Sequence, residues 1–309
     1  MNRRIFLGLT TALAMLPLSA FAQDKLPVVA SFSILGDMVA EVGGDRVAVT
    51  TLVGADGDGH VYQPTPADAQ AVGVAKLVVV NGLAFEGWFD RLIEAAEYKG
   101  VVVVASDGIT PRAMTAEEGH AEGEAEADPA SHDHGDFDPH AWQDLGNARL
   151  YVANIAKGLT EADPAGADVY AANAAAYLAQ IDTVEAEVKA AVAALPADRR
   201  TIVTSHDAFG YFAAAYGMNF LAPQGVNTEA EASAADVAAL ITQIKDQSIG
   251  AVFVENISDP RLLEQIAAET GAKAGGTLYS DALSAGAPAD TYLNMMRHNI
   301  ATLTAALGE

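Results

Sequence analysis

Three of the seven histidines in this 309-residue chain lie at junctions between segments of regular pattern. His60 lies in a loop after an apolar run, His140 comes just before a helical segment, and His206 lies where a strand changes to a helix. Asp281 follows another apolar segment. Imidazole and carboxylate groups are common ligands of divalent transition metals. Ligands of open α/β sheets bind beyond the carboxyl ends of the strands, so these four side chains could converge on one metal ion.

Prolines flank two of these histidines and would stiffen the backbone that carries them. Pro64 and Pro66 follow His60, and Pro139 precedes His140. A fixed backbone is what a preformed metal site requires. Taken alone, a histidine in a loop is more often solvated or hydrogen-bonded than a metal ligand. The hypothesis therefore depends on the group and its flanking residues.

Three carboxylates are candidates to orient the histidine rings from the side that faces away from a metal. They are Asp138, Asp207 and Glu255. Alternatively, Asp138 and Asp207 only cap helices. Aromatic residues beside the ligands either keep water from the site or pack in the core; they are Tyr62, Trp142 and Phe209.

The segment at 115–137 is rich in Glu, Asp, His, Gly and Ala, which predicts a long loop. Its histidines, His120, His132 and His134, form an accessory group that would capture zinc weakly and raise its concentration near the main site. The alternative is a solvated insertion with no role in binding. His298, in the last helical segment, is assigned a structural role.

Short apolar runs alternate with helical segments in both halves, which predicts an α/β protein of two lobes with parallel sheets. An alanine-rich stretch at 164–195 would form a helix of about 45 Å. We expect an N-terminal lobe at 23–163, a long rigid linking helix at 164–195, a C-terminal lobe at 196–309, and the metal site in the cleft between the lobes. The expected strands cover residues 27–32, 47–53, 76–80, 101–105, 201–204, 219–222, 251–255 and a segment from 274. The expected helices cover residues 34–42, 85–96, 147–159, 164–195, 209–216, 233–246, 260–270 and 291–307.

Residues 1–22 resemble a secretory signal, with basic residues at Arg3 and Arg4, an apolar stretch, and a cleavage site near Ala22/Gln23. The paired arginines leave both the general and the twin-arginine export routes open. The chain has no cysteine, so we expect no disulfide and no lipid-bearing cysteine, and therefore a soluble periplasmic protein. The net charge of −24 would repel nucleic acid and attract cations.

Three motifs give the chain a resemblance to a known family. They are His-x-Tyr-x-Pro-x-Pro from His60, Asp-Pro-His-x-Trp at 138–142, and Ser-His-Asp-Ala-Phe at 205–209. With them the chain resembles the cluster A-I solute-binding proteins of bacterial zinc and manganese ABC importers, from about residue 27 to the C-terminus. Within that family it is most similar to zinc-binding members such as AztC.

The resemblance implies that His60, His140, His206 and Asp281 are the metal ligands. Manganese-binding members of the family carry glutamate at the third ligand position, where this chain has His206. Three imidazoles and one carboxylate suit Zn²⁺, whereas Mn²⁺ favours more oxygen donors. The implied function is capture of Zn²⁺ by a periplasmic monomer and delivery to the membrane permease of an ABC importer, without enzymatic activity.

Two other classes of protein compete with this interpretation. A zinc hydrolase would use the three histidines and a metal-bound water, but the chain lacks the His-Glu-x-x-His motif of many such enzymes. A metal-binding adhesin or a metallochaperone would bind the ion without a permease. A separate periplasmic zinc metallochaperone that loads this chain is a further candidate partner.

Overall fold

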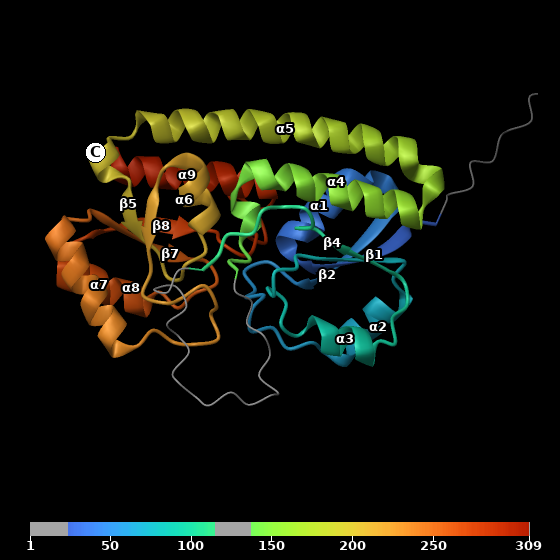
Figure 1. The fold of residues 1–309 in the computed structure, drawn as a ribbon, viewed down its shortest axis with the longest axis horizontal. Helices are drawn as coiled ribbons and strands as arrows, with labels where there is room; N and C mark the ends of the chain where they lie inside the picture. The colour runs from blue at the N-terminus through green and yellow to red at the C-terminus, as the bar shows by residue number, and fades with distance from the viewer. Residues whose placement is uncertain (1–23, 115–136, 309) are drawn as a thin grey trace, which may run out of the picture.

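Two four-stranded parallel sheets, one in each half of the chain, form the frame of the molecule (Figure 1). The computed structural model describes residues 24–114 and 137–308. The strand order is β2-β1-β3-β4 in the first sheet and β6-β5-β7-β8 in the second, so the two lobes repeat one topology. The prediction of two α/β lobes with parallel sheets is confirmed. The strands are β1 (Leu26–Phe32), β2 (Val47–Val53), β3 (Leu77–Val80), β4 (Val101–Val104), β5 (Thr201–Val203), β6 (Asn219–Leu221), β7 (Ala251–Glu255) and β8 (Lys273–Leu278).

The central strands of the first sheet are apolar along their whole buried length. Val28 and Val29 of β1 and Leu77 and Val78 of β3 are almost fully buried, and Val28 pairs with Leu77. Such continuous apolar runs are typical of parallel strands that helices cover on both faces. Because β2 and β3 lie on opposite sides of β1, the loops at the carboxyl ends diverge and leave room for a ligand.

Helices pack on both faces of the sheets, and side-chain caps fix where several of them begin. Figure 1 shows α4 and α5 above the first sheet and α2 and α3 below it. Thr65 and Asp68 form a capping box at α2, and the Ser233 and Thr291 side chains cap α7 and α9. The helices are α1 (Ser33–Gly43), α2 (Pro66–Val74), α3 (Phe89–Ala95), α4 (Leu145–Ala162), α5 (Ala167–Ala194), α6 (Gly210–Tyr216), α7 (Ala234–Gln247), α8 (Arg261–Thr270) and α9 (Tyr292–Leu307).

The helix α5 links the two lobes. Its 28 residues span about 42 Å, and it packs on α1 and α4 of the first lobe and on α6 and α9 of the second. Pro164–Gly166 form a short 3-10 turn, so the α-helix begins slightly later than the sequence predicts. Among the helices in 24–114 and 137–308, none combines the length and apolar character needed to cross a membrane.

One hydrophobic cluster runs through both lobes along α5. It includes Met38 of α1, Ile181 of α5 and Met296 of α9. A smaller cluster fills the second lobe under α7 and α8, around Leu240 and Ile266. The lobes thus share a continuous apolar core on the side of α5, while loops from both lobes meet on the opposite side (Figure 1).

The largest difference from the sequence prediction lies between β3 and α3. The pattern predicts a helix at 85–96, but α3 begins only at Phe89. Leu83 and Ala84 have positive φ angles, and the buried Glu86 carboxylate accepts the backbone N–H groups of Asn81 and Gly82. These contacts hold a turn where a helix would otherwise start. The helix α2 was not predicted from the sequence, and the predicted signal at 1–22 lies outside the described residues.

Candidate metal centre

The side chains of His60, His140, His206 and Asp281 meet in one buried cluster. One ligand atom of each residue lies within 4.8 Å of all the others. His60 Nε2 is 3.2 Å from His140 Nε2 and 3.4 Å from Asp281 Oδ2. The same carboxylate lies 3.5 Å from His140 Nε2 through Oδ1 and 3.2 Å from His206 Nε2 through Oδ2. The structure brings together all four residues that the sequence selects.

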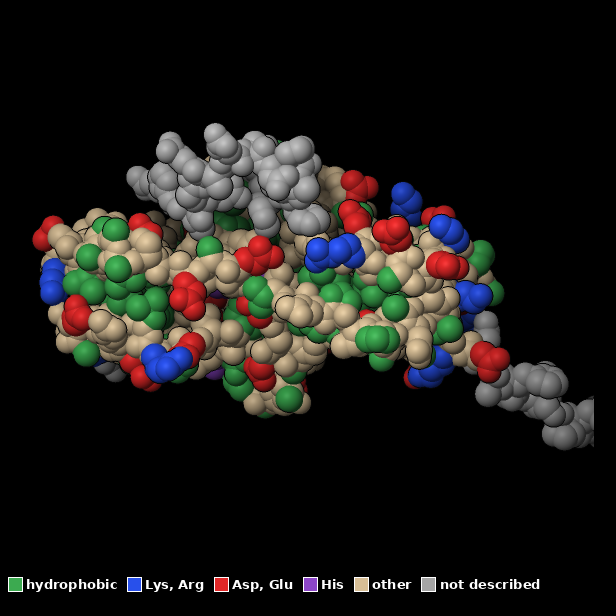
Figure 2. All heavy atoms as spheres, turned by 90° about the horizontal axis from the view of Figure 1, so that it is seen from below, with side chains coloured by type: hydrophobic (Ala, Val, Ile, Leu, Met, Phe, Trp, Pro, Cys, Tyr) green, Lys and Arg blue, Asp and Glu red, His purple; other side chains and the backbone are tan. Residues whose placement is uncertain are grey.

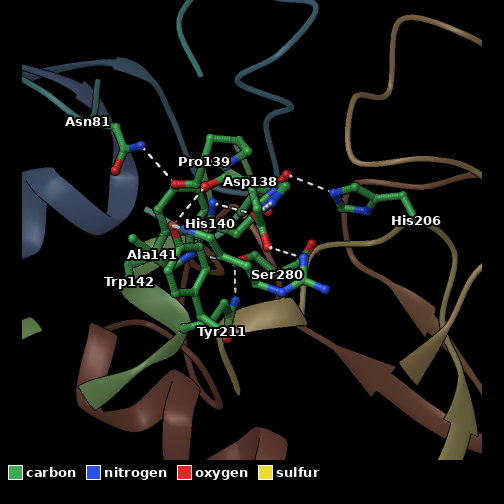
Figure 3. A network of polar contacts seen from close by, with 12 residues as sticks. Asn81, Asp138, Pro139, His140, Ala141, Trp142, His206, Tyr211 and Ser280 are labelled. Atoms are coloured by element: carbon green, nitrogen blue, oxygen red, sulfur yellow. Dashed lines mark hydrogen bonds and ion pairs between the residues drawn. The ribbon is translucent and has the colours of Figure 1, made fainter. Parts of the chain in front are cut away.

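Each lobe contributes two of these side chains from loops at the carboxyl ends of strands. His60 lies between β2 and α2, and His140 directly precedes a 3-10 turn that leads into α4. His206 lies between β5 and α6, and Asp281 follows β8. Figure 3 shows His206 pointing toward the residues around His140 from the other lobe. The cluster therefore lies between the lobes, where two open sheets of this type leave a crevice.

Two of the three predicted partner carboxylates orient histidine rings. Asp138 Oδ1 lies 2.8 Å from His140 Nδ1 and also accepts the backbone N–H of His140. Glu255 Oε2 lies 2.6 Å from His206 Nδ1. With Nδ1 of each ring held by a carboxylate, Nε2 is left as the atom that can bind a metal. Both contacts support an orienting role for these two carboxylates. The backbone N–H of the third candidate, Asp207, donates to the carbonyl of Gly225.

Asn81 is a buried residue of the site region that no sequence motif marks. Its side-chain N–H donates to the carbonyl of Pro139 at 2.9 Å, and its carbonyl accepts the hydroxyl of Tyr151 at 2.6 Å. Asn81 thereby fixes the backbone immediately before His140 (Figure 3). The signal that could have found it is its position directly after the buried strand β3, at the edge where ligands collect.

Burial and neighbouring carboxylates act in opposite directions on the histidines. Burial lowers the pKa of His60. Burial also opposes protonation of His140, but the charge of Asp281 and the hydrogen bond to Asp138 raise its pKa to about 9. At His206 the charges of Glu255 and Asp281 likewise outweigh burial and raise the pKa well above its usual value. A metal ion that binds Nε2 of His140 and His206 would therefore compete with protons for these two rings.

Asp281 is ionised despite its complete burial. Burial alone would raise the pKa of its carboxyl group, but the charges of His140 and His206 hold that pKa well below its usual range. Both carboxylate oxygens and His206 Nε2 are buried without a hydrogen-bond partner among the described residues. Buried polar atoms normally have a partner, and a cation coordinated by these atoms would supply it.

The spacing of the donor atoms fits a small divalent ion. With metal–nitrogen distances of about 2.0–2.1 Å, the ligand atoms of a tetrahedral zinc site lie about 3.3–3.4 Å apart. The shortest separations within the cluster are close to this value: 3.2, 3.4, 3.5 and 3.2 Å. The ligand atoms of the four residues all lie within 4.8 Å of one another, so the widest pair would close by at most about 1.5 Å to reach tetrahedral spacing.

Aromatic rings enclose the side of the cluster that faces the first lobe. The Phe85 ring lies 4.6 Å from the His60 ring, and Trp142 lies 5.2 Å from the His140 ring. Trp142 is fully buried and donates to the carbonyl of Ser280, which ties it to the second lobe. Of the aromatic residues that the sequence suggested, Trp142 borders the site, while Tyr62 packs on Trp88 and Phe209 on Phe220. Phe85 was missed because nothing in its local sequence marks it.

The remaining histidines divide into two groups. His298 packs on Tyr279, and its Nε2 lies 3.0 Å from the carbonyl of Thr277, in keeping with the structural role predicted for it. The accessory histidines, His120, His132 and His134, lie outside the described residues. Ala113 and Phe137, which flank that segment, pair as an isolated antiparallel bridge.

On the face opposite α5, acidic side chains are spread over both lobes (Figure 2). This distribution agrees with the net charge of −24. A negative surface raises the local concentration of cations and lowers that of anions such as phosphate backbones.

Comparisons with known proteins place the chain in a family. The family model described as zinc-uptake complex component A, periplasmic (ZnuA) matches residues 28–306. The chain is 35% identical to the manganese-binding lipoprotein MntA of Halalkalibacterium halodurans, over 93% of this chain and 90% of that protein. It is 33% identical to the iron-binding protein YfeA of Yersinia pestis, over 92% and 87% of the two chains. Its structure resembles the periplasmic zinc-binding protein TroA from Treponema pallidum, with a TM-score of 0.83, 31% identity, and coverage of 92% and 99%. The chain belongs to the ZnuA family of periplasmic metal-binding components of uptake systems.

Proposed function

We propose that this protein captures Zn²⁺ in the periplasm through His60, His140, His206 and Asp281 and delivers it to the permease of an ABC importer. The observation that carries the proposal is a buried set of three imidazole nitrogens and one carboxylate, drawn from both lobes. Membership of the ZnuA family supports uptake rather than an enzymatic role. The importer permease is accordingly the partner, and Zn²⁺ is cargo rather than a resident cofactor.

The donor set favours zinc over harder ions. Nitrogen donors outnumber oxygen donors in the cluster, and Zn²⁺ accepts tetrahedral sites of this composition. Mn²⁺ prefers more oxygen ligands and a higher coordination number. The third histidine, His206, is the residue on which this preference depends. We therefore propose that this protein prefers zinc, as AztC-like members of the family do.

One observation favours manganese as a second candidate. Both oxygens of Asp281 face the cluster, one toward His140 and the other toward His206. A carboxylate that binds through both oxygens would raise the coordination number above four, which suits Mn²⁺ better than Zn²⁺. The curated relative MntA is named as a manganese binder.

A competition titration separates the two metals. Purified metal-free protein is loaded with equimolar Zn²⁺ and Mn²⁺, and the bound metal is measured by elemental analysis. We expect one Zn²⁺ per chain and a preference for zinc of about 100-fold or more, following the usual order of affinities at nitrogen-rich sites. Retention of manganese in the presence of equimolar zinc would replace the zinc assignment with the manganese one.

A pair of histidine variants tests the ligand set. His206→Ala removes one donor from the cluster, whereas His298→Ala removes a histidine that contacts Thr277 and Tyr279. Calorimetry should show a loss of zinc affinity of about 100-fold or more for the first and little change for the second. Equal affinities of the two variants would overturn the assignment of His206.

We propose the following roles for the segments of the chain. Residues 1–22 act as an export signal cleaved near Ala22/Gln23, and the mature protein is a soluble periplasmic monomer. The lobes at 23–163 and 196–309 close on the ion, with the linking helix at 164–195 behind them. The main site would receive its zinc from two sources. One is a periplasmic zinc metallochaperone, and the other is the group of histidines at 120, 132 and 134.

A further inference from the structure

The loop that carries His60 contacts the opposite lobe at three points. The backbone N–H of Asp56 donates to the carbonyl of Leu283 at 2.8 Å. Asn256 donates through its side-chain N–H to Asp56 Oδ1 at 2.9 Å. Thr228 donates through its hydroxyl to Asp58 Oδ2 at 2.7 Å. All three contacts join residues 170 or more positions apart in the sequence.

Each contact lies next to a ligand or to a residue that orients one. Asp58 precedes His60 by two positions, and Leu283 follows Asp281 by two. Asn256 directly follows Glu255, whose carboxylate holds the ring of His206. The loop at 54–60 is therefore tied to a residue two positions from the ligand Asp281 and to the neighbour of Glu255, which contacts the ring of the ligand His206.

The carboxylate of Asp58 makes one contact through each of its two oxygens. Its Oδ1 accepts the backbone N–H of His60 at 2.9 Å, while its Oδ2 accepts the Thr228 hydroxyl. A carboxylate acceptor makes a hydrogen bond stronger than a neutral one does. The side chain thus holds the backbone of a ligand and the opposite lobe at the same time.

On the other side, Thr228 is connected to the backbone at His206. Gln224 donates through its side-chain N–H to the carbonyls of Thr228 and Ala230, which organises the loop. Gln224 also pairs with His206 as an isolated parallel bridge. A continuous path of polar contacts thus runs from His60 through Asp58, Thr228 and Gln224 to His206 without passing through the metal cluster.

We propose that Asp56, Asp58, Thr228 and Asn256 form an interlobe clasp that positions His60 against the ligands of the second lobe and sets the rate at which the bound metal leaves. This inference rests on the proposed function, because it assigns a role at the same site. The four residues are positioning residues, since none of them belongs to the ligand cluster.

The location of the clasp explains why it would control release. On the side of α5 the lobes share a continuous apolar core, which resists separation. The clasp lies at loops where polar groups meet, and water can replace such contacts at small net cost. Among the four ligands His60 alone has measurable exposure, at 5%, whereas the other three are at 0%. Opening at the clasp would withdraw His60 first and expose the ion to solvent.

The test compares release rates of the zinc-loaded full-length protein and its variants. Thr228→Val removes the hydroxyl but keeps the shape, and leaves the bond from Asp58 to His60 in place. Thr228→Ser restores the hydroxyl, and Asn256→Asp places a second carboxylate beside Asp56. Thr183→Val is the matched control, because Thr183 lies exposed on α5 and its hydroxyl donates to Ala179 within the helix. Release is followed by stopped flow with excess chelator.

We expect Thr228→Val to release zinc about five- to tenfold faster than the native protein, as loss of a partly exposed bond to a carboxylate predicts. Asn256→Asp should also be faster, Thr228→Ser should stay within about twofold of native, and Thr183→Val should be unchanged. The melting temperature of metal-free Thr228→Val should match that of Thr183→Val. Native release rates in both Thr228→Val and Asn256→Asp would overturn the clasp, as would a change confined to melting temperature. Failure of the native protein to bind metal would instead contradict the proposed function.

Discussion

The Nδ1 atom of His206 lies 2.6 Å from Oε2 of Glu255. The other oxygen of this carboxylate accepts the backbone N–H groups of Ser205 and His206, at 2.8 and 2.9 Å. Both oxygens of Glu255 therefore face donors, and the carboxylate fixes the backbone and the ring of one ligand together. The ion pair with Glu255 favours the proton on Nδ1, so the proton that a metal ion would displace is the one on Nε2, which faces the cluster.

Glu255→Gln should weaken zinc binding by about 10- to 100-fold, the usual cost of losing a partner that orients a ligand. The amide nitrogen of glutamine must face either the backbone N–H groups or Nδ1 of His206. In the first case two buried donors lose their acceptor, and in the second the ring takes the wrong tautomer. Isothermal titration with a competing chelator measures the change.

Glu187→Gln is the matched control, because Glu187 lies on α5 and pairs with Arg297 at an exposed position. Its zinc affinity should equal that of the native protein. Native affinity in Glu255→Gln as well would show that the carboxylate has no part in setting the tautomer of His206.

Zinc binding should release about two protons per ion at pH 7, because His140 and His206 have raised pKa values in the metal-free protein. Affinity should then rise by about 100-fold per pH unit between pH 6.5 and 8, since two protons compete with each ion. Calorimetry in buffers of different ionisation enthalpy counts the protons. A count near zero would mean that both histidines are already neutral.

The same pKa shifts predict how the stability of the metal-free protein depends on pH. The pKa of His140 is raised to about 9 in the folded chain, above the ordinary value of 6.5. Its contribution is therefore fully present below about pH 6.5 and is lost as the pH rises through 9, by at most about 3 kcal/mol. Metal-free protein should melt at lower temperature at pH 9 than at pH 7. A higher melting temperature at pH 9 than at pH 7 would contradict a raised pKa of His140 in the folded chain.

Saturating zinc should raise the melting temperature, because the ion binds ligands from both lobes that separate on unfolding. A free concentration about 1,000 times the dissociation constant stabilises by about 4 kcal/mol. Differential scanning fluorimetry with and without zinc measures the shift, and Asp281→Ala, which removes the carboxylate from the cluster, should lose most of it. An unchanged melting temperature in the native protein would show that the folded chain does not bind zinc.

Removing residues 117–134 should slow zinc uptake at low zinc concentration yet leave one tight site. The flanking residues make this deletion practical, because Ala113 pairs with Phe137 and the backbone N–H of Asp138 donates to the carbonyl of Arg112. A short glycine linker can therefore join the ends. A variant with His120, His132 and His134 changed to asparagine separates the imidazoles from the acidic groups. If the stoichiometry falls from one to zero, the segment supplies essential ligands.

Sequence patterns predicted the frame of the fold well where short apolar runs carry the information. The expected strands at 47–53 and 251–255 coincide with β2 and β7, and Ser233 and Thr291 stand at the caps of their helices. Prediction failed around residues 83–86, because a buried carboxylate and two positive φ angles interrupt a segment whose composition suits a helix. Helix propensity describes the preference of a short segment in isolation, whereas this turn depends on contacts made by the buried Glu86 side chain in the folded protein.

The three candidate histidines could be selected from the sequence because each stands in a recognisable motif, whereas Asp281 was selected mainly by the family resemblance. Asp138 and Glu255 were also predictable, since both lie near strand ends or beside a ligand. The pairing of Asp58 with Thr228 was not, because it joins two loops 170 residues apart that carry no periodic pattern. The same holds for Phe85, which reaches His60 only through the fold.

The raised pKa values of His140 and His206 have a consequence for recognition by a partner. If two protons leave when one divalent ion enters, as the raised pKa values predict, loading exchanges equal amounts of charge and is electrically neutral. The long-range field around this acidic molecule is therefore nearly the same with and without cargo. A membrane partner that distinguishes full from empty carriers must read short-range shape, and electrostatic steering would bring both forms to it equally fast.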